Sequence, residues 1–342
     1  MVSYAATPPE RRVIPAWLPQ AVLYCCSAAC LVWVLHGYPL HDLFTAIATL
    51  DFRWVLLAVA FDLSVYVCHG WRWNTLLAPV VRLRLWRTVQ AVYIGLFANE
   101  LLPLRSGEVI RCYLLAHWNN FRISLSLSSA VVERLIDGLW MVAAFAVTAG
   151  FVKGMPHDLT LLVRVLAALL VAGSGAFCWV VWHEQDVHRA IGHRRGASTL
   201  RHVVEGLHLM GGLHTLSKTM GLSLLYLALQ AATVWALMKA YGLDLSFWVA
   251  GGVLTVVRLG TVVPNAPGNL GLFQVACVVA LGLFDVEKND AKTFSFIMFF
   301  SLTLPLLVGG AVATALARLN LGELRQRAAR TMRAARHHGA HS

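Results

Sequence analysis

Residues 98–111 read ANELLPLRSGEVIR and lie between long apolar runs. A second charged stretch, VERLID at residues 132–137, opens another apolar run. Together the two stretches place four carboxylates and three arginines within or beside apolar sequence, where a membrane protein normally carries none. Ionisable groups at membrane depth are expensive, and they usually mark a transport pathway or a ligand site. These two stretches therefore decide how the rest of the chain is interpreted.

The overall composition is that of a membrane protein. Of the 342 residues, 58% are hydrophobic and 13% are charged, and the mean hydropathy is +0.66. A soluble domain carries about a quarter charged residues, and a spanning helix needs about 20 apolar residues in a row. Several runs reach that length. We predict an all-α polytopic membrane protein with one integral membrane domain over residues 1–342.

Six apolar runs are long enough to span a bilayer, and two further runs are interrupted. The six lie at about residues 17–36, 54–71, 126–152, 159–182, 220–241 and 294–317. The interrupted runs are residues 89–102, ended by Pro103 and Gly107, and residues 247–284, broken at Pro264, Pro267 and Gly268 with Gly271 beyond. Proline and glycine at these places favour re-entrant elements.

The order of these runs indicates an internal repeat. A span, a re-entrant element and a span over residues 54–152 are followed by the same order over residues 220–317. Broken helices at matching places in two halves of opposite orientation are typical of transporters. We therefore predict two inverted repeats.

Cations in the loops predict the orientation. Placing both termini in the cytoplasm puts 20 loop cations inside and 4 outside, which follows the positive-inside rule. The inner side then includes an N-terminal segment at residues 1–15, a basic amphipathic segment at residues 183–218 and a basic tail at residues 318–342. The Ala-, Arg- and Val-rich composition is typical of a GC-rich bacterial genome, and we expect the protein in the bacterial inner membrane.

No catalytic signature is present in the sequence. It contains no GxSxG motif, P-loop, HExxH motif or paired Cys/His metal spacing, and its seven cysteines form no CxxC pair. We expect no enzyme activity, no cofactor and no metal, and a membrane glycosyl or acyl transferase is the less favoured alternative. The net charge of +11 is dispersed over loops without an aromatic platform, so we expect no nucleic-acid partner.

The first charged stretch carries candidate ligands for an anion. Arg105, Glu108 and Arg111 are spaced by three residues and share one face of a helix. Arginine binds phosphate through two parallel hydrogen bonds, which suits a lipid head group. The alternative is that these charges pair among themselves at the interface. Asn99 and Glu100 lie deeper, near the tip of the re-entrant element.

The second charged stretch, residues 132–137, has three possible roles: a gate, a head-group site or a structural charge cluster. Glu133 and Asp137 are one helical turn apart, and Arg134 is three residues from Asp137, so a local ion pair can form. Arg258 stands alone in an apolar run and needs either a carboxylate, such as Glu133 or Asp137, or a lipid phosphate.

The second interrupted run predicts a pair of half-helices around PNAPGNLGLFQ, residues 264–274. Asn269 is placed to cap the second half-helix, whose first N–H groups would offer their dipole to an anion inside the membrane. The alternative is a plain tight turn between two short helices.

Three ordered motifs resemble one family. N-x-L-L-P-x-R-x-G-E-x-x-R at residues 99–111, V-x-E-R-L-x-D at residues 131–137 and P-x-x-P-G-x-x-G at residues 264–271 resemble the lysylphosphatidylglycerol synthase transmembrane region, a flippase-like family. The resemblance implies translocation of an anionic phospholipid, a polyprenyl-phosphate-linked lipid or a hopanoid-type lipid. These residues contain no soluble aminoacyl-transferase domain, so we expect no lysylated lipid to be made.

The resemblance fails at two positions and leaves two hypotheses open. Family members often carry P-G-G-x-G-x-x-E, whereas this chain has Asn269 and Gln274, and Gln274 cannot carry a proton in place of that acid. The first hypothesis is a lipid translocase whose intramembrane arginines hold the head group. The second is a non-transporting membrane subunit that binds a lipid or an enzyme of cell-envelope synthesis.

Overall fold

The computed structural model describes residues 18–102, 106–149, 212–261 and 267–318, with isolated positions between 161 and 210. Helices form the regular structure of this described part, and no strand occurs in it. In chain order they are α1 (Leu18–Leu35), α2 (Leu40–Thr49), α3 (Phe52–Leu77), α4 (Leu85–Leu101), α5 (Gly107–Trp118), α6 (Ile123–Ala149), α10 (Leu213–Tyr241), α11 (Phe247–Gly260), η2 (Pro267–Asn269), α12 (Leu272–Gly282) and α13 (Lys288–Leu316).

The predicted helical membrane fold is confirmed. By length and composition, α3, α10 and α13 are able to cross a membrane. The predicted spans 17–36 and 126–152 correspond to α1 and to the 27-residue helix α6. The segment 1–15 and most of the residues 159–182, 183–218 and 318–342 lie outside the described residues.

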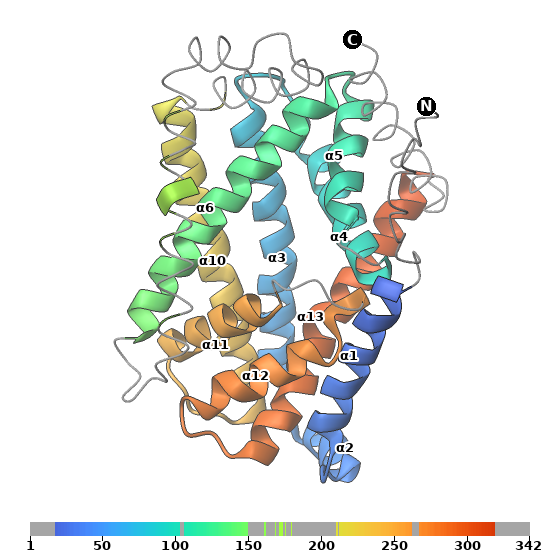
Figure 1. The fold of residues 1–342 in the computed structure, drawn as a ribbon, viewed down its shortest axis with the longest axis vertical. Coiled ribbons are helices and arrows are strands. Elements are labelled where there is room, and N and C mark those ends of the chain that lie inside the picture. The colour runs from blue at the N-terminus through green and yellow to red at the C-terminus, as the bar shows by residue number, and fades with distance from the viewer. Residues whose placement is uncertain are drawn as a thin grey trace, which may run out of the picture.

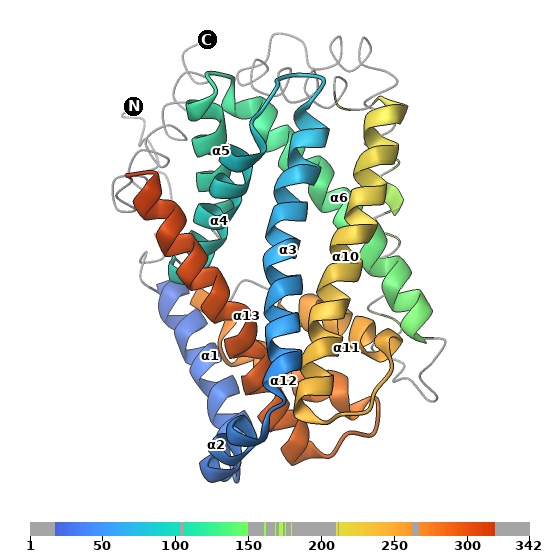
Figure 2. The ribbon, with the colours of Figure 1, turned by 180° about the vertical axis from the view of Figure 1, so that it is seen from behind.

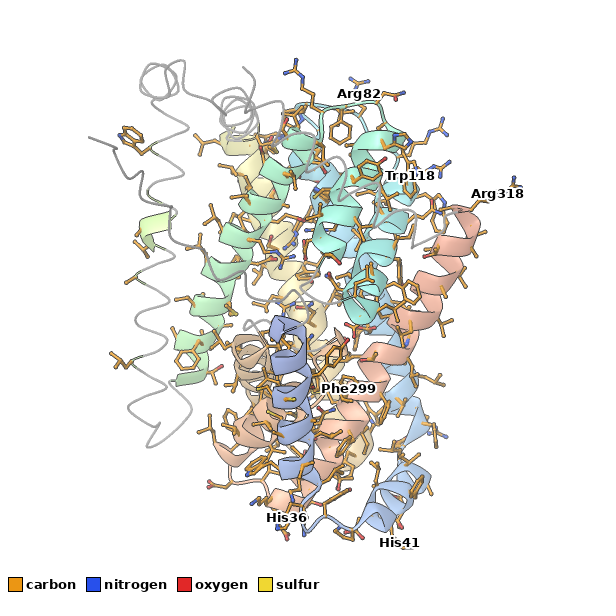
Figure 3. The ribbon with its side chains drawn as sticks, turned by 45° about the vertical axis from the view of Figure 1, so that its right-hand side comes forward. His36, His41, Arg82, Trp118, Phe299 and Arg318 are labelled. Atoms are coloured by element: carbon orange, nitrogen blue, oxygen red, sulfur yellow. The ribbon has the colours of Figure 1, made fainter. Side chains whose placement is uncertain are left out.

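The long helices run between two ends of the molecule. Arg82 and Trp118 mark one, which we call the Arg82 end, and His36 and His41 mark the other, the His41 end (Figure 3). Helix α3 runs from the His41 end to the Arg82 end, and α10 returns beside it (Figure 1). Helix α6 runs from the Arg82 end toward the His41 end, and α13 runs from the His41 end toward the Arg82 end.

Two short hairpins stop inside the molecule. Helices α4 and α5 enter from the Arg82 end, whereas α11 and α12 enter from the His41 end (Figures 1 and 2). Each hairpin is flanked in sequence by two long helices, and the directions in the two units are opposite. The re-entrant elements predicted from the interrupted runs are therefore present, in the opposed arrangement of an inverted repeat; the unit boundaries at 54–152 and 220–317 stay predictions.

Two apolar cores surround the central α3–α10 pair. Toward the Arg82 end, Trp73 of α3 packs with α4, α5 and α6. Toward the His41 end, Ala58 of α3 packs with α10, α11, α12 and α13. Outward positions of α13, such as Leu304 and Val308, expose apolar side chains, as lipid-facing helices do. Each core thus holds one hairpin against the long helices.

Glycine allows the two arms of each hairpin to approach closely. A Cβ atom on Gly107 would lie 1.8 Å from the carbonyl oxygen of Gly95, and one on Gly260 would lie 2.7 Å from the Cβ atom of Ala276. Small residues at such contacts let helix backbones pack tightly in a membrane. The tips of the two hairpins also meet, since α4 contacts η2 and a Cβ atom on Gly268 would lie 3.3 Å from Oε2 of Glu100.

Candidate functional site

Two buried arginines from different helices converge on one glutamate. Glu133 of α6 is fully buried, and its two carboxylate oxygens accept hydrogen bonds from different partners. Arg111 of α5 donates from Nη2 to Oε2 at 3.0 Å, and Arg72 of α3 donates from Nη2 to Oε1 at 3.3 Å. Arg72 is 0% exposed and Arg111 is 1% exposed. Glu133 therefore joins the first hairpin to the long helices α3 and α6.

Further polar groups complete the coordination of these arginines. Asp137 accepts two hydrogen bonds from Arg72, one of them at 3.3 Å, and Ser223 of α10 accepts another at 3.2 Å. Nε2 of His69 lies 2.9 Å from Nη1 of Arg111 and 3.5 Å from Oε1 of Glu133. The guanidinium of Arg111 also stacks over the ring of Trp73, at 4.7 Å from its centroid. These contacts bring α10 into the same network.

Glu108 and Arg134 form the accessible rim of this cluster. Glu108 accepts from Arg111 at 2.8 Å and from Arg134 at 2.8 Å. Arg134 also lies 3.8 Å from Asp137, so the predicted pair three residues apart is present. The side chain of Arg134 is 53% exposed, because it projects from a different face of α6 than Glu133. Among the predicted arginines of this cluster, Arg134 is thus the one that an outside molecule can reach.

The cluster balances its own charge. It contains three carboxylates and three guanidinium groups, which are Glu108, Glu133 and Asp137 with Arg72, Arg111 and Arg134. Buried ions are tolerated when each is paired and hydrogen-bonded. The balance explains how these charges persist inside the membrane domain. Within the described residues, no group of three His, Cys, Asp or Glu side chains is placed to hold a metal ion.

Arg258 lies beside the cluster without joining it. Its guanidinium stands over the ring of Tyr226 at 5.6 Å, and Arg72 stands over the same ring at 4.6 Å. His69 meets that ring edge-on at 5.4 Å. The described residues place no carboxylate within ion-pair distance of Arg258, so the predicted pairing with Glu133 or Asp137 is not formed. Arg258 adds one positive charge beside a cluster that is otherwise neutral.

Asn99 and Glu100 lie at the tip of the first hairpin. Oδ1 of Asn99 accepts the backbone N–H of Gly107 at 2.8 Å, which satisfies the first amide of α5. The N–H of Gly107 is therefore already hydrogen-bonded and is not free to bind the anion predicted at the start of α5. Glu100 faces Gly268 of the second hairpin. Pro103 and Arg105 lie outside the described residues, so the predicted face shared by Arg105, Glu108 and Arg111 is observed only for its last two members.

The break in the second hairpin differs from the prediction. Gly271, with φ +89°, caps α12, and its N–H donates to Oε1 of Gln274 at 2.7 Å. Asn269 was expected to be this cap, but it sits in the short turn η2 with φ +54°. Helix α1 packs against the start of α12, where a Cβ atom on Gly271 would lie 2.4 Å from the carbonyl oxygen of Ser27. The start of α12 is therefore covered by α1, and Pro264 lies outside the described residues.

Several members of the network were missed by the sequence reasoning. Arg72 lies just beyond the span predicted at residues 54–71, and His69, Ser223 and Tyr226 were not singled out. The missed signal is the run that follows Arg72, because Trp73, Leu76 and Leu77 continue an apolar helix. Since His69 and Arg72 are three residues apart, they share one face of that helix. A histidine and an arginine on one face of a continuing helix indicate a buried polar network.

The chain matches a known family over nearly its whole length. The family described as lysylphosphatidylglycerol synthase TM region matches residues 17–334. The chain belongs to this family. It is also 24% identical to a UPF0104 membrane protein of Methanothermobacter thermautotrophicus over 275 residues, covering 71% of this chain and 78% of that protein. A UPF0104 membrane protein of Methanocaldococcus jannaschii is 24% identical over 220 residues, covering 61% of this chain and 91% of that protein.

Proposed function

We propose that this protein moves an anionic lipid across the membrane and binds the phosphate of its head group with Arg258 and Arg134. The observation that carries the proposal is the state of Arg258, a cation within the membrane domain with no carboxylate among the described residues to neutralise it. Unpaired cations at such depth are costly, and they mark ligand or ion pathways. A phosphate would neutralise Arg258 and accept two of its hydrogen bonds.

The other arginines have a different role in this proposal. Arg72 and Arg111 are fully buried and already paired, so they hold α3, α5 and α6 together rather than contact the lipid. Arg134 is half-exposed on α6 and can exchange Glu108 for a phosphate. The lipid classes in question are an anionic phospholipid, a polyprenyl-phosphate-linked lipid and a hopanoid-type lipid. Arginine selects the first two, since they carry a phosphate.

The two hairpins provide the route in this proposal. Each enters from a different end, and their tips meet at Glu100 and Gly268. Transporters built from inverted repeats open one side at a time by moving one repeat against the other around a central site. Separation of a hairpin from the long helices on one side would admit the head group to Arg258. The acyl or prenyl chains would stay in the surrounding lipid.

The second candidate is a membrane subunit that binds a lipid or an envelope-synthesis enzyme without transport. The balanced charge of the cluster favours it, because three carboxylates already satisfy three arginines. In that case the cluster is a fixed element of the fold, and Arg258 serves only to hold a bound lipid. The two candidates differ on movement, and they share lipid binding only where the subunit's ligand is a lipid.

Reconstitution into liposomes tests movement directly. Vesicles carrying fluorescent phosphatidylglycerol or phosphatidylethanolamine are treated with a membrane-impermeant quencher, and the protein-dependent loss of inner-leaflet signal is followed. We expect the wild type to expose the anionic lipid, and Arg258→Ala to slow this at least tenfold. Lys239→Ala is the matched control, since Lys239 pairs with the exposed Asp244 at the end of α10 and should keep wild-type rates. No acceleration for any anionic lipid would refute transport.

Mass spectrometry of co-purified lipids tests binding independently. We expect one anionic or polyprenyl-phosphate lipid to be enriched with the wild type and with Lys239→Ala. Arg258→Ala and Arg134→Ala should each reduce that enrichment. Enrichment without movement would select the non-transporting subunit that binds a lipid. Profiles equal to the bulk membrane would reject lipid binding and favour the subunit that binds an envelope-synthesis enzyme.

A further inference from the structure

A second buried acid lies apart from the ion cluster. Asp62 sits in the middle of α3, and its side chain is 5% exposed. Seven residues separate it from His69, so both lie on the same face of α3, two turns apart. This face packs against α10. Asp62 is therefore an ionisable group within one of the spanning helices and between the two apolar cores.

Asp62 differs from the cluster carboxylates in having no cation. Glu133 and Asp137 each contact at least one arginine, whereas the side chain of Asp62 interacts with the phenol of Tyr66 and with no basic group of the described chain. Its Oδ2 atom has no hydrogen-bond partner. An ionised carboxylate without a cation is very costly away from water, and the neutral acid costs much less. The chemistry at this position thus calls for a bound proton.

An unsatisfied acceptor lies on the neighbouring helix. The antiparallel α3–α10 pair is held by the hydrogen bond from Asp51 N–H to the carbonyl oxygen of Ala240 near one end and by the bond from the Cys68 thiol to the carbonyl oxygen of Leu222 near the other. This register places Gln230 within about one helical turn of the level of Asp62. Gln230 is four residues from Tyr226, so it lies on the face of α10 that meets α3. Its Oε1 atom is buried and has no donor.

No basic group and no second carboxylate of the described residues interacts with Asp62. The phenols of Tyr66 on α3 and Tyr93 on α4 lie near it, and Tyr226 on α10 neighbours Tyr66. The apolar core beside this part of α3 includes Phe294 and Met298 of α13. The nearest basic groups on the same face, His69 and Arg72, are engaged with Glu133, Asp137 and Arg111. A proton at this level is therefore held by Asp62.

We propose that Asp62 and Gln230 form a proton-binding site that couples this protein to a proton gradient. The carboxylate takes one proton from one aqueous side, and the new O–H at Oδ2 donates to Oε1 of Gln230. Release of the same proton to the other side restores the carboxylate, and no other reactant is consumed. The tyrosine next to Asp62, Tyr66, neighbours Tyr226, the ring that carries Arg258. The coupling rests on the proposed lipid transport, whereas the proton site does not.

Infrared spectroscopy of the purified full-length protein in lipid tests the proton site. The wild type at neutral pH should show a carboxylic acid C=O band that is absent from Asp62→Asn. Asp285→Asn is the matched control, because Asp285 is exposed and should leave the band intact. Gln230→Leu should shift the band to higher frequency by removing its acceptor. A spectrum of Asp62→Asn equal to the wild type, or a band that sodium ions abolish at constant pH, would overturn the assignment.

The coupling is tested with an imposed pH gradient across the vesicles. The gradient should accelerate lipid movement by the wild type and by Asp285→Asn several-fold. Asp62→Asn imitates the protonated acid, so it should retain basal movement and lose this acceleration. Equal acceleration of Asp62→Asn would overturn the coupling. If the wild type moves no lipid at all, the coupling fails together with the proposed function, and the infrared band still decides the proton site.

Discussion

The two re-entrant hairpins have the same architecture and opposite chemistry. Each has two arms, close contact through a glycine, and a second arm whose first N–H is accepted by a side-chain amide. The α4–α5 hairpin presents Glu108 and Arg111 to a buried ion network. The α11–α12 hairpin packs mainly through apolar side chains and carries one cation, Arg258. Both hairpins must satisfy the backbone N–H groups at the start of a second arm. The first hairpin is held by ion pairs, whereas the second is held mainly by apolar packing.

This difference separates a fixed hairpin from one that is freer to move. Ion pairs and hydrogen bonds are directional, so the cluster holds α5 in one position relative to α3 and α6. Apolar packing in a membrane depends on close contact rather than on direction, and surrounding lipid is as apolar as the core. The second hairpin therefore loses less when it shifts. In the proposed transport cycle we expect α11 and α12 to move against a frame that includes the first hairpin.

Each hairpin contains a buried cysteine that reports on its own unfolding. Cys112 on α5 and Cys277 on α12 are both 0% exposed. Labelling by a thiol reagent during heating, with each site quantified by mass spectrometry, gives a separate midpoint for each hairpin.

Loss of the central carboxylate should have the largest effect on this comparison. Glu133→Gln removes a charged partner that the buried Arg72 and Arg111 share, and breaking a buried ion pair costs about 3–5 kcal/mol. We expect the labelling midpoint of Cys112 to fall well below that of Cys277. Asp285→Asn, the same chemical change at an exposed site, should leave both midpoints unchanged. Equal falls at the two cysteines would show that the hairpins unfold as one unit.

A methyl group in the hairpin contacts should have the next largest effect. Gly107→Ala meets a backbone oxygen that cannot move aside, whereas Gly260→Ala meets another methyl group. Overpacking costs about 1–3 kcal/mol, and we expect the upper part of this range or more at Gly107 and the lower part at Gly260. The midpoint of Cys112 should fall in the first variant and that of Cys277, by less, in the second.

Gly251→Ala is the control for this pair of substitutions. Gly251 lies on α11, and a Cβ atom there would have open space around it. Alanine favours a helix over glycine by about 1 kcal/mol, so stability should stay equal or rise. A destabilised Gly251→Ala would mean that the helix itself, rather than the contact, responds to the methyl group.

The hairpins and the ion cluster were predictable from sequence because their signals are local. Apolar runs too short to span, ended by proline and glycine, indicated both hairpins. The spacing of Glu133, Arg134 and Asp137 indicated a cluster, and the cost of buried charge required partners for it. Such arguments need only the residues within one or two helical turns.

The rest depended on contacts between distant segments. Arg72 follows an apolar run and resembles a loop cation, yet Asp137, 65 residues away, receives its hydrogen bonds. Asn269 has a side chain that can cap a helix, but it lies in the turn η2 with a positive φ, and Gly271 caps α12 instead. Asp62 has no charged neighbour within one turn, so its isolation could be judged only after α10 had been placed beside it.

The smallest predicted effect concerns the amides that cap the inner arms. Asn99→Leu and Gln274→Met remove the acceptors of the Gly107 and Gly271 N–H groups while nearly keeping side-chain volume. An unsatisfied buried donor costs about 1–3 kcal/mol, so each variant should lower the midpoint of its own hairpin by a similar amount. Asn119→Leu, at the outer end of α5, should have little effect because water can replace its bond to Leu115. If only Asn99→Leu is destabilising, then the second hairpin tolerates an open cap, as expected of the arm that moves. If both respond equally, the greater freedom of that hairpin must come from its apolar packing alone.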